Sequence, residues 1–178
     1  TYPLSLHDAL PISVYEGLKA ANGTDYVLIH DGARPLVDNE IIVRSMHTVE
    51  KEKACVAGMP VKDTIKVSDE LGYSANTPDR KSLWQIQTPQ CFEYDLLAQS
   101  YDKLFSDMSY GKNVPAITDD AMIVEYGSDT KVKLIEGSYE NIKVTTPEDM
   151  GIAELFLKKR RSEEHTSELQ SHHDIVCR

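Results

Sequence analysis

The chain has 178 residues, of which 40% are hydrophobic and 27% are charged, and its formal net charge at pH 7 is −10. A chain of this length can bury one substantial core and form one domain, or two at most. The negative charge excludes nucleic acid as a partner bound through a general basic surface. With no apolar run of roughly 18 residues, no leader-like start and only 3 cysteines without regular spacing, we expect a cytoplasmic globular protein that does not enter a membrane.

The two ends of the chain lack the patterns of its middle. Residues 1–12 (TYPLSLHDALPI) carry no periodicity that continues, and residues 161–178 (RSEEHTSELQSHHDIVCR) are polar and patternless. SLHDALPI and RSEEHTSELQSH resemble translations of the DNA adapters that are used in sequencing. We therefore expect residues 13–160 to be the natural part of the chain. No function is assigned to the histidines of the tails, which are His7, His165, His172 and His173.

The first elements of the middle predict an α/β protein. A helix at residues 15–22, ended by Gly23, precedes a short apolar run at residues 26–30 that is typical of a buried parallel strand. Apolar spacing predicts a helix at residues 39–51, and the run at residues 54–59 predicts a second buried strand. This order indicates a sheet with helices on both faces.

A different pattern follows at about residues 60–83. Residues 61–67 alternate between apolar and polar side chains, SDELGY supplies a turn, and residues 74–80 are polar and extended. Two strands with so little core of their own need another surface to lie on. A second copy of the chain is the simplest such surface, so we expect a two-stranded arm that contributes to a homodimer.

The remaining chain alternates again between strand and helix. After WQIQ at residues 84–87, two further strands are predicted at residues 132–135 and 141–144, and three further helices at residues 94–108, from 118 to about 126, and from 146 onward. The last helix has clear start signals, because Thr146 suits the cap and Pro147 suits the first helical position.

Two charged positions suit chemistry at the ends of strands. HDGARP, at residues 30–35, follows the first predicted strand, and open α/β sheets bind ligands beyond such ends. Asp31 suits a carboxylate aimed at a metal or a hydroxyl, and Arg34 suits a brace for phosphate or for that carboxylate. The competing interpretation is a helix-capping Asp with a structural Arg, and spacing does not separate the two.

Lys143 lies in the predicted strand before the last helix, where a lysine can meet phosphate near a helix N-terminus. An exposed edge-strand lysine is the competing interpretation. Thr64 and Arg80 lie on the arm, where phosphate recognition competes with plain solvation. For Asp119 and Asp120, ordinary helix capping is favoured.

Five segments, taken in order, resemble a known family. IHDGARP, PVKDTIK, TPDRKSLWQIQTPQ, TDDA and EGSYENIKVTTPED resemble the 2-C-methyl-D-erythritol 4-phosphate cytidylyltransferases of the non-mevalonate isoprenoid pathway. The ribitol-5-phosphate cytidylyltransferases share HD-x-x-RP, QTPQ and NIK-x-TTP but fit less well through DTIK and TPDR-x-x-LW. A third hypothesis is a non-catalytic dimerisation or regulatory module.

The resemblance implies a Rossmann-like nucleotidyltransferase fold with a mixed, mostly parallel sheet, helices on both faces and a protruding β-arm that joins a homodimer. It implies cytidylyl transfer from CTP to methylerythritol phosphate with Mg²⁺ and release of pyrophosphate. By position, Asp31 and Lys143 would be catalytic and contact CTP, Asp31 would also hold the metal, and Ser13 would contact cytosine. The substrate-binding residues would be Arg34, Thr64, Arg80, Thr88 and Thr118.

The sequence also departs from the family pattern. Family members begin with a strand and a Gly-rich loop that carries an Arg and, further on, a Lys, and these cradle the triphosphate. No segment before Ser13 matches that loop. We therefore expect the first βα elements to be missing from this chain and the 178 residues alone to be inactive.

Overall fold

The computed structural model describes residues 6–176, with side chains over residues 12–162. The chain divides into two compact units. The sheet unit comprises the chain up to His30 together with Asp38–Ser138, and the helix unit comprises Asp31–Val37 together with the chain from Tyr139 onward.

The sheet unit is built on a four-stranded sheet in the order β1-β5-β2-β6. Strands β1 (Tyr26–Ile29) and β2 (Ala54–Pro60) both pair antiparallel with β5 (Trp84–Glu93), whereas β6 (Lys133–Glu136) pairs parallel with β2. Strands β1, β2 and β6 therefore run in one direction and β5 runs against them. This arrangement confirms the mixed sheet that the resemblance implies.

Strand β1 differs from the prediction of a buried parallel strand. It runs in the same direction as β2, but its hydrogen-bonded partner is the antiparallel β5, with Leu28 opposite Cys91. Its side chains are half-buried or exposed, because β1 is the edge of the described sheet. The apolar run predicts the strand correctly, but nothing within one strand specifies which other strand will lie beside it.

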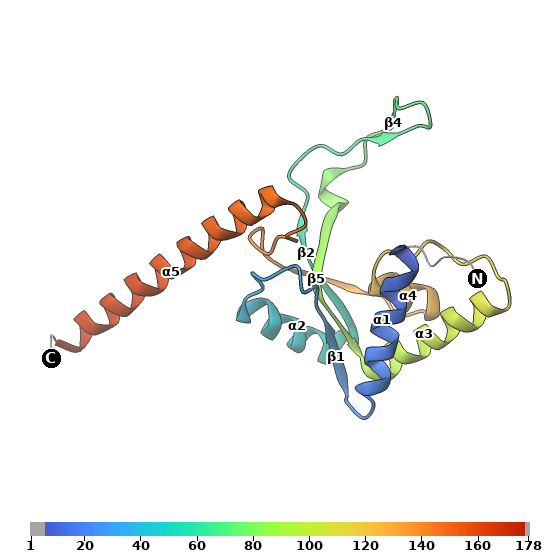
Figure 1. The fold of residues 1–178 in the computed structure, drawn as a ribbon, viewed down its shortest axis with the longest axis horizontal. Coiled ribbons are helices and arrows are strands. Elements are labelled where there is room, and N and C mark those ends of the chain that lie inside the picture. The colour runs from blue at the N-terminus through green and yellow to red at the C-terminus, as the bar shows by residue number, and fades with distance from the viewer. Residues whose placement is uncertain (1–5, 177–178) are drawn as a thin grey trace. The chain divides into compact units, whose positions relative to one another are not determined.

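Helices cover both faces of this sheet, as predicted (Figure 1). Helix α2 (Asn39–Glu52) lies on one face, where the Cys55 thiol contacts the backbone oxygen of Ser45 at 3.4 Å. Helices α1 (Leu6–Ala20), α3 (Tyr94–Ser109) and α4 (Asp120–Gly127) lie on the other.

The main core lies between the sheet and α1, α3 and α4. Successive side chains of a strand point to opposite faces, so Ala54 and Val56 enter this core while Cys55 faces α2. Both faces of β2 are therefore covered, which explains the burial of its first six residues. The buried members of this core are Leu18, Ala54, Val56, Phe92, Leu97, Tyr101, Leu104, Ala121, Ile123 and Val124.

Two aspartates start the helices at their predicted positions. The Asp38 carboxylate accepts a hydrogen bond from the backbone N–H of Ile41 at 2.8 Å, at the start of α2. The Asp119 carboxylate accepts one from the N–H of Met122 at 3.0 Å, at the start of α4. The capping role predicted at the start of α4 is therefore confirmed. The interpretation of Asp31 as the cap of the following helix is wrong, because Asp38 holds that position.

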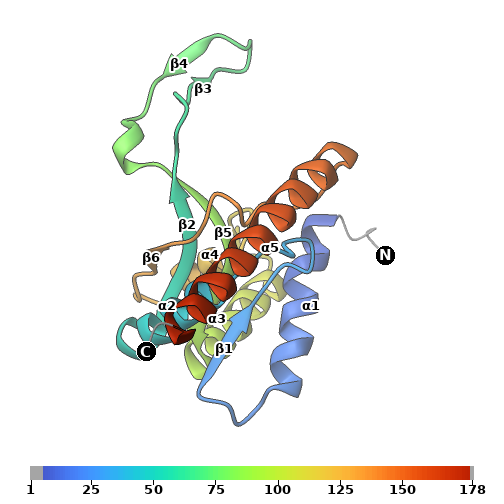
Figure 2. The ribbon, with the colours of Figure 1, turned by 90° about the vertical axis from the view of Figure 1, so that its left-hand side faces the viewer.

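The predicted arm is a hairpin that extends beyond the ends of β2 and β5 (Figure 2). Its strands β3 (Val67–Ser68) and β4 (Ser74–Asn76) pair antiparallel, and the short 3₁₀ helix η1 (Arg80–Ser82) leads back to β5. Residues 61–66 do not form the predicted strand. An alternating pattern favours a strand that has one covered face. Almost all side chains of the arm are exposed, so no face of this segment is covered.

The helix unit joins the loop Asp31–Val37 to the segment that precedes α5 (Pro147–Val176). The N–H of Val144 donates to the backbone oxygen of Ala33 at 2.8 Å. The Arg160 guanidinium donates to the backbone oxygen of Leu36 at 2.9 Å. The strand predicted at residues 141–144 is wrong, since this segment meets the loop through isolated hydrogen bonds and not through a ladder.

Helix α5 begins as its sequence predicts, with Pro147 at its first position. The Asp149 carboxylate accepts hydrogen bonds from the N–H groups of Thr145 and Thr146, both at 2.9 Å. These two bonds are the main cause of the lowered pKa of Asp149. The negative side chain thus satisfies backbone donors before the first turn.

The tails predicted to be artefacts at residues 1–12 and 161–178 overlap α1 and α5. A helical backbone does not depend on the origin of its residues, so this assignment stays a prediction. The side chains of His7, His165, His172 and His173 lie outside the described residues. None of the helices that the structure describes combines the length and the apolar character of a membrane span.

Asp107 joins α3 to α4 through three donors. Its carboxylate lies 2.5 Å from Lys112 Nζ, 2.8 Å from the Tyr126 hydroxyl and 3.3 Å from Lys103 Nζ. The hydrogen bond from Lys112, followed by that from Tyr126, lowers the pKa of Asp107 to about 2 from its ordinary 3.8. The ionised carboxylate therefore stabilises the folded chain above about pH 4, and this stabilisation is lost as the pH falls toward 2.

We expect the unfolding free energy of the wild-type chain to fall more steeply between about pH 4 and about pH 2 than that of an Asp107→Asn variant. Urea unfolding followed by circular dichroism measures both slopes. The matched control is Glu125→Gln, which removes an exposed carboxylate from α4 and should keep the wild-type slope. Equal slopes for wild type and Asp107→Asn would contradict the assignment.

Tyr101 makes the second link between these helices. Its ring is fully buried, and its hydroxyl donates to the Asp120 carboxylate at 2.6 Å. Burial, followed by the nearby Asp120 charge, raises the pKa of Tyr101, so the hydroxyl keeps its proton. Tyr101→Phe should cost about 1.5–3 kcal/mol in urea unfolding, because a mostly buried carboxylate loses a donor. Tyr110→Phe, at an exposed position, should change stability by less than about 0.5 kcal/mol.

Candidate active site

Asp31 lies between two cations in the helix unit. Its Oδ2 atom is 3.1 Å from Lys143 Nζ and 3.3 Å from Arg34 Nε. The side chains of Asp31 and Lys143 are 24% and 44% exposed, so solutes can reach both. The structure therefore brings together the two residues to which the resemblance assigns catalytic roles, although they lie far apart in the sequence.

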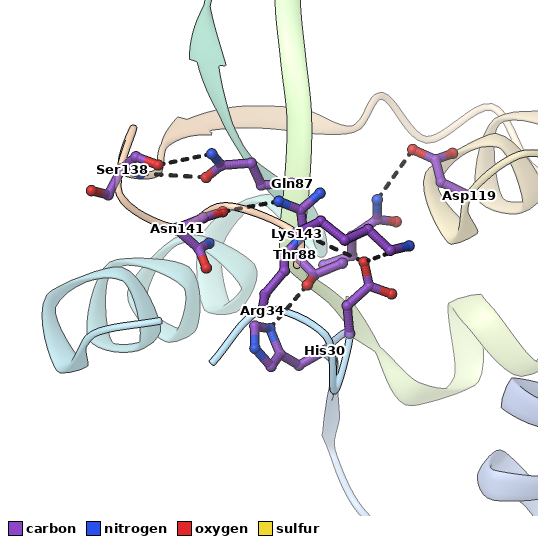
Figure 3. A network of polar contacts seen from close by, with 10 residues as sticks. His30, Arg34, Gln87, Thr88, Asp119, Ser138, Asn141 and Lys143 are labelled. Atoms are coloured by element: carbon purple, nitrogen blue, oxygen red, sulfur yellow. Dashed lines mark hydrogen bonds and ion pairs between the residues drawn. The ribbon is translucent and has the colours of Figure 1, made fainter. Parts of the chain in front are cut away.

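The backbone around this group explains how it is held. The N–H of Arg34 donates to the backbone oxygen of Asp31 at 2.9 Å, which closes a tight turn. The Arg34 guanidinium also donates to the backbone oxygen of Asn141 at 2.9 Å (Figure 3). Asn141 is fully buried, so Arg34 joins the Asp31 loop to a fixed point two residues before Lys143. Of the two roles predicted for Arg34, the structure supports the brace for the carboxylate.

This arrangement suits a phosphorylated ligand. Two cations face one carboxylate, which leaves one positive charge in excess, and the lysine ammonium is the more exposed of the two cations. Lysine binds phosphate as a point charge, and arginine holds a carboxylate in a fixed orientation.

The same residues fit one kind of metal binding only. No group of three or more His, Cys, Asp or Glu side chains that could hold a metal ion occurs within the described residues. Magnesium is commonly bound by one or two carboxylates together with the phosphates of a substrate. Asp31 therefore fits a magnesium ion that arrives with a nucleotide, and the described residues do not fit an all-protein cage.

In the sheet unit, β5 carries the predicted residue Thr88. The Thr88 hydroxyl lies 2.9 Å from His30 Nδ1, so it holds the end of β1 directly before Asp31 in the chain (Figure 3). No motif or spacing predicts a role for His30. Its position between β1 and Asp31 is the signal that could have identified it.

Gln87 makes a similar contact to the chain after β6. Its Nε2 donates to the backbone oxygen of Ser138 at 2.8 Å, and its Oε1 accepts from the Ser138 N–H at 3.4 Å (Figure 3). A Cβ atom on Gly137 would lie 2.4 Å from Gln87 Oε1, so a larger residue there would force the end of the Gln87 side chain to move. No motif predicts a role for Gln87, although a polar residue in the middle of a buried strand signals a specific hydrogen-bond partner.

The other predicted site residues lie on separate elements of the sheet unit. The Thr118 hydroxyl lies 3.1 Å from Met122 Sδ, directly before α4. Thr64 and Arg80 are exposed on the arm, where Arg80 donates to the backbone oxygen of Lys62 at 3.0 Å. Ser13 is exposed on α1. The roles predicted for these four residues stay predictions.

Comparison with known proteins agrees with the motifs. A family model for 2-C-methyl-D-erythritol 4-phosphate cytidylyltransferase matches residues 9–159. The protein of that name from Lachnospira eligens is 51% identical over 146 residues, which cover 82% of this chain and 63% of the relative. The one from Caldanaerobacter subterraneus is 49% identical over 148 residues, covering 83% and 62%. The chain thus spans less than two thirds of the length of these relatives.

Solved structures agree with the fold. The chain is similar to the 4-diphosphocytidyl-2C-methyl-D-erythritol synthase of Anaerococcus prevotii, with a TM-score of 0.75, 36% identity, and coverage of 83% of this chain and 63% of that one. It is also similar to the 2-C-methyl-D-erythritol 4-phosphate cytidylyltransferase of Thermus thermophilus, with a TM-score of 0.69, 29% identity, and coverage of 83% and 68%. The predicted Rossmann-like nucleotidyltransferase fold is confirmed, and the chain belongs to the 2-C-methyl-D-erythritol 4-phosphate cytidylyltransferase family.

Proposed function

We propose that the protein that contains this chain transfers the cytidylyl group of CTP to 2-C-methyl-D-erythritol 4-phosphate. A phosphate oxygen of the sugar phosphate attacks the α-phosphorus of CTP, the bond from that phosphorus to the bridging oxygen breaks, and pyrophosphate leaves. The observation that carries the proposal is the Asp31 carboxylate held between Lys143 and Arg34. The family membership supports the choice of both substrates.

Lys143 has the clearest role in this reaction. Negative charge builds up on the α-phosphate oxygens as the attacking oxygen of the sugar phosphate approaches the phosphorus. An ammonium group beside them stabilises that charge. The Asp31 contact supports this role, because it holds the flexible lysine side chain in one place before substrate binds. Positioning and charge neutralisation supply most of the catalysis in such transfers.

Asp31 orients Lys143 and is the residue that would hold a magnesium ion. Such an ion, when bound to the nucleotide, neutralises charge on the phosphates and on the departing pyrophosphate. The fixed hydrogen bond from Arg34 to the backbone of Asn141 keeps the Asp31 carboxylate oriented while its lysine partner interacts with substrate.

The arm would supply the remaining recognition, in a homodimer in which Thr64 and Arg80 bind the sugar phosphate at the partner's site. Two observations support this role. The arm exposes large apolar side chains, with Leu71 83% and Tyr73 70% exposed, as expected of a surface that packs on another chain. Arg80 is exposed and offers a phosphate-binding fork. Thr88 and Thr118 would contact substrate from the sheet unit, and Ser13 would contact cytosine.

A turnover assay with two sugar phosphates tests the proposed function. The gene, resequenced upstream of residue 13, would be expressed and the protein incubated with CTP, Mg²⁺ and either methylerythritol phosphate or ribitol 5-phosphate. We expect a cytidine diphosphate product from methylerythritol phosphate by ³¹P NMR. We expect none from the 178-residue chain alone, because its sequence has no counterpart of the Gly-rich triphosphate loop. Faster turnover of ribitol 5-phosphate would overturn the substrate, and a folded dimer without CTP binding would indicate a non-catalytic module.

Replacing Lys143 tests the site itself. The protein expressed from the resequenced gene is called the turnover-competent protein below. In it, Lys143→Met should lower kcat about 10²–10³-fold, because the α-phosphate loses its main preorganised cation. The KM for CTP should change by less than about tenfold, since the interaction strengthens only as charge develops. Lys158→Met, at an exposed lysine of α5, is the matched control and should keep wild-type kinetics. A kcat of Lys143→Met near that of the control would contradict the role.

A further inference from the structure

Gln90 is a buried amide in the middle of the sheet. Its position on β5 pairs with Ile29 of β1 and Val56 of β2, and the residue is 2% exposed. Transfer of an amide from water into such a place is unfavourable unless both its polar ends find partners. A polar residue here therefore needs a specific reason.

Both ends of the Gln90 amide contact the start of α4. The Nε2 group donates to Asp119 Oδ2 at 3.1 Å, and Oε1 accepts from the backbone N–H of Ala121 at 3.0 Å. One donor and one acceptor on α4 are thus matched by one acceptor and one donor on β5. These two hydrogen bonds fix the position of the first turn of α4 along β5.

The position of Thr118 depends on this first turn of α4. It directly precedes Asp119, and its hydroxyl lies 3.1 Å from the Met122 sulfur, one turn into α4. The Asp119 carboxylate caps the Met122 N–H with Oδ1 while its Oδ2 binds Gln90. A shift of Asp119 therefore moves the backbone that carries Thr118, and the exposed Thr118 side chain moves with it.

We propose that Gln90 is a positioning residue that sets the place of Thr118 and, through it, the affinity for the sugar phosphate substrate. This inference rests on the proposed function for the identity of that substrate. Gln90 itself lies in the core and does not touch substrate. Its effect on kinetics is transmitted through two hydrogen bonds, so exchange of the donor and acceptor across one of them tests it.

Kinetics of a Gln90→Met variant give the first test, in the turnover-competent protein. Methionine fills a similar volume but makes neither hydrogen bond. We expect the KM for methylerythritol phosphate to rise at least tenfold while the KM for CTP stays within threefold of wild type. Loss of folded protein would lower the apparent kcat and leave both KM values unchanged. The matched control is Gln85→Met, the same substitution at an exposed position of β5, which should keep both KM values.

A reciprocal exchange gives the second test. Gln90→Glu keeps an acceptor for Ala121 but places a carboxylate against the Asp119 carboxylate, and should raise the KM for the sugar phosphate. Adding Asp119→Asn restores a donor and an acceptor across the same pair of atoms and keeps the cap on Met122, so the double variant should return to within threefold of wild type. Failure of the double variant to recover, with wild-type folding, would overturn the proposal.

Amide exchange measured by NMR gives a readout that needs no turnover. The Ala121 N–H should exchange at least tenfold faster in Gln90→Met and at the wild-type rate in Gln85→Met. An unchanged Ala121 rate would show that Gln90 does not hold the turn, and would overturn the proposal whatever the enzyme does. A wild-type protein that turns over neither sugar phosphate would remove the proposed function, and with it the substrate named here, while the exchange rates would still decide whether Gln90 fixes the segment that carries Thr118.

Discussion

Strand β5 is the constraint on which the rest of the sheet unit depends. This strand of ten residues pairs with both β1 and β2 and so joins them in one sheet. Its N-terminal end receives the chain from the arm, and its polar side chains hold three other segments: Gln87 contacts the chain after β6, Thr88 contacts His30, and Gln90 contacts the start of α4. One strand thus fixes the positions of segments that carry predicted site residues or lie next to them in the chain.

Local charge at the site opposes the charge of the whole chain. The formal net charge is −10, yet Asp31 is flanked by Lys143 and Arg34 and the group is positive by one charge. An acidic surface repels negatively charged ligands in general. An anionic ligand therefore binds here only if it makes several contacts with the locally positive group. Under the proposed function, a nucleoside triphosphate would bring its cation with it, and a site with one carboxylate fits such a ligand.

The sequence predicts what is local and what a motif marks. The starts of α4 and α5 follow from Asp119 and Pro147, because caps and fixed dihedrals act within one turn. The meeting of Asp31 and Lys143 follows from the family motifs. The antiparallel partner of β1 and the missing strand at residues 141–144 depend on segments far away in the chain, and periodicity carries no information about them. Periodicity does not predict the two contacts of Gln90 either, because its partners lie about 30 residues further on.

A double-mutant cycle tests most directly whether Asp31 and Lys143 act as one unit on the reacting phosphate. The measurement is kcat/KM of the turnover-competent protein as wild type, as Asp31→Asn, as Lys143→Met and as the double variant. Groups in contact that stabilise the same transition state give strongly non-additive losses. We predict that the double variant loses no more than about tenfold beyond the more severe single variant. Losses that multiply across the two substitutions would contradict the account, because they would mean that the 3.1 Å contact joins two groups that work independently.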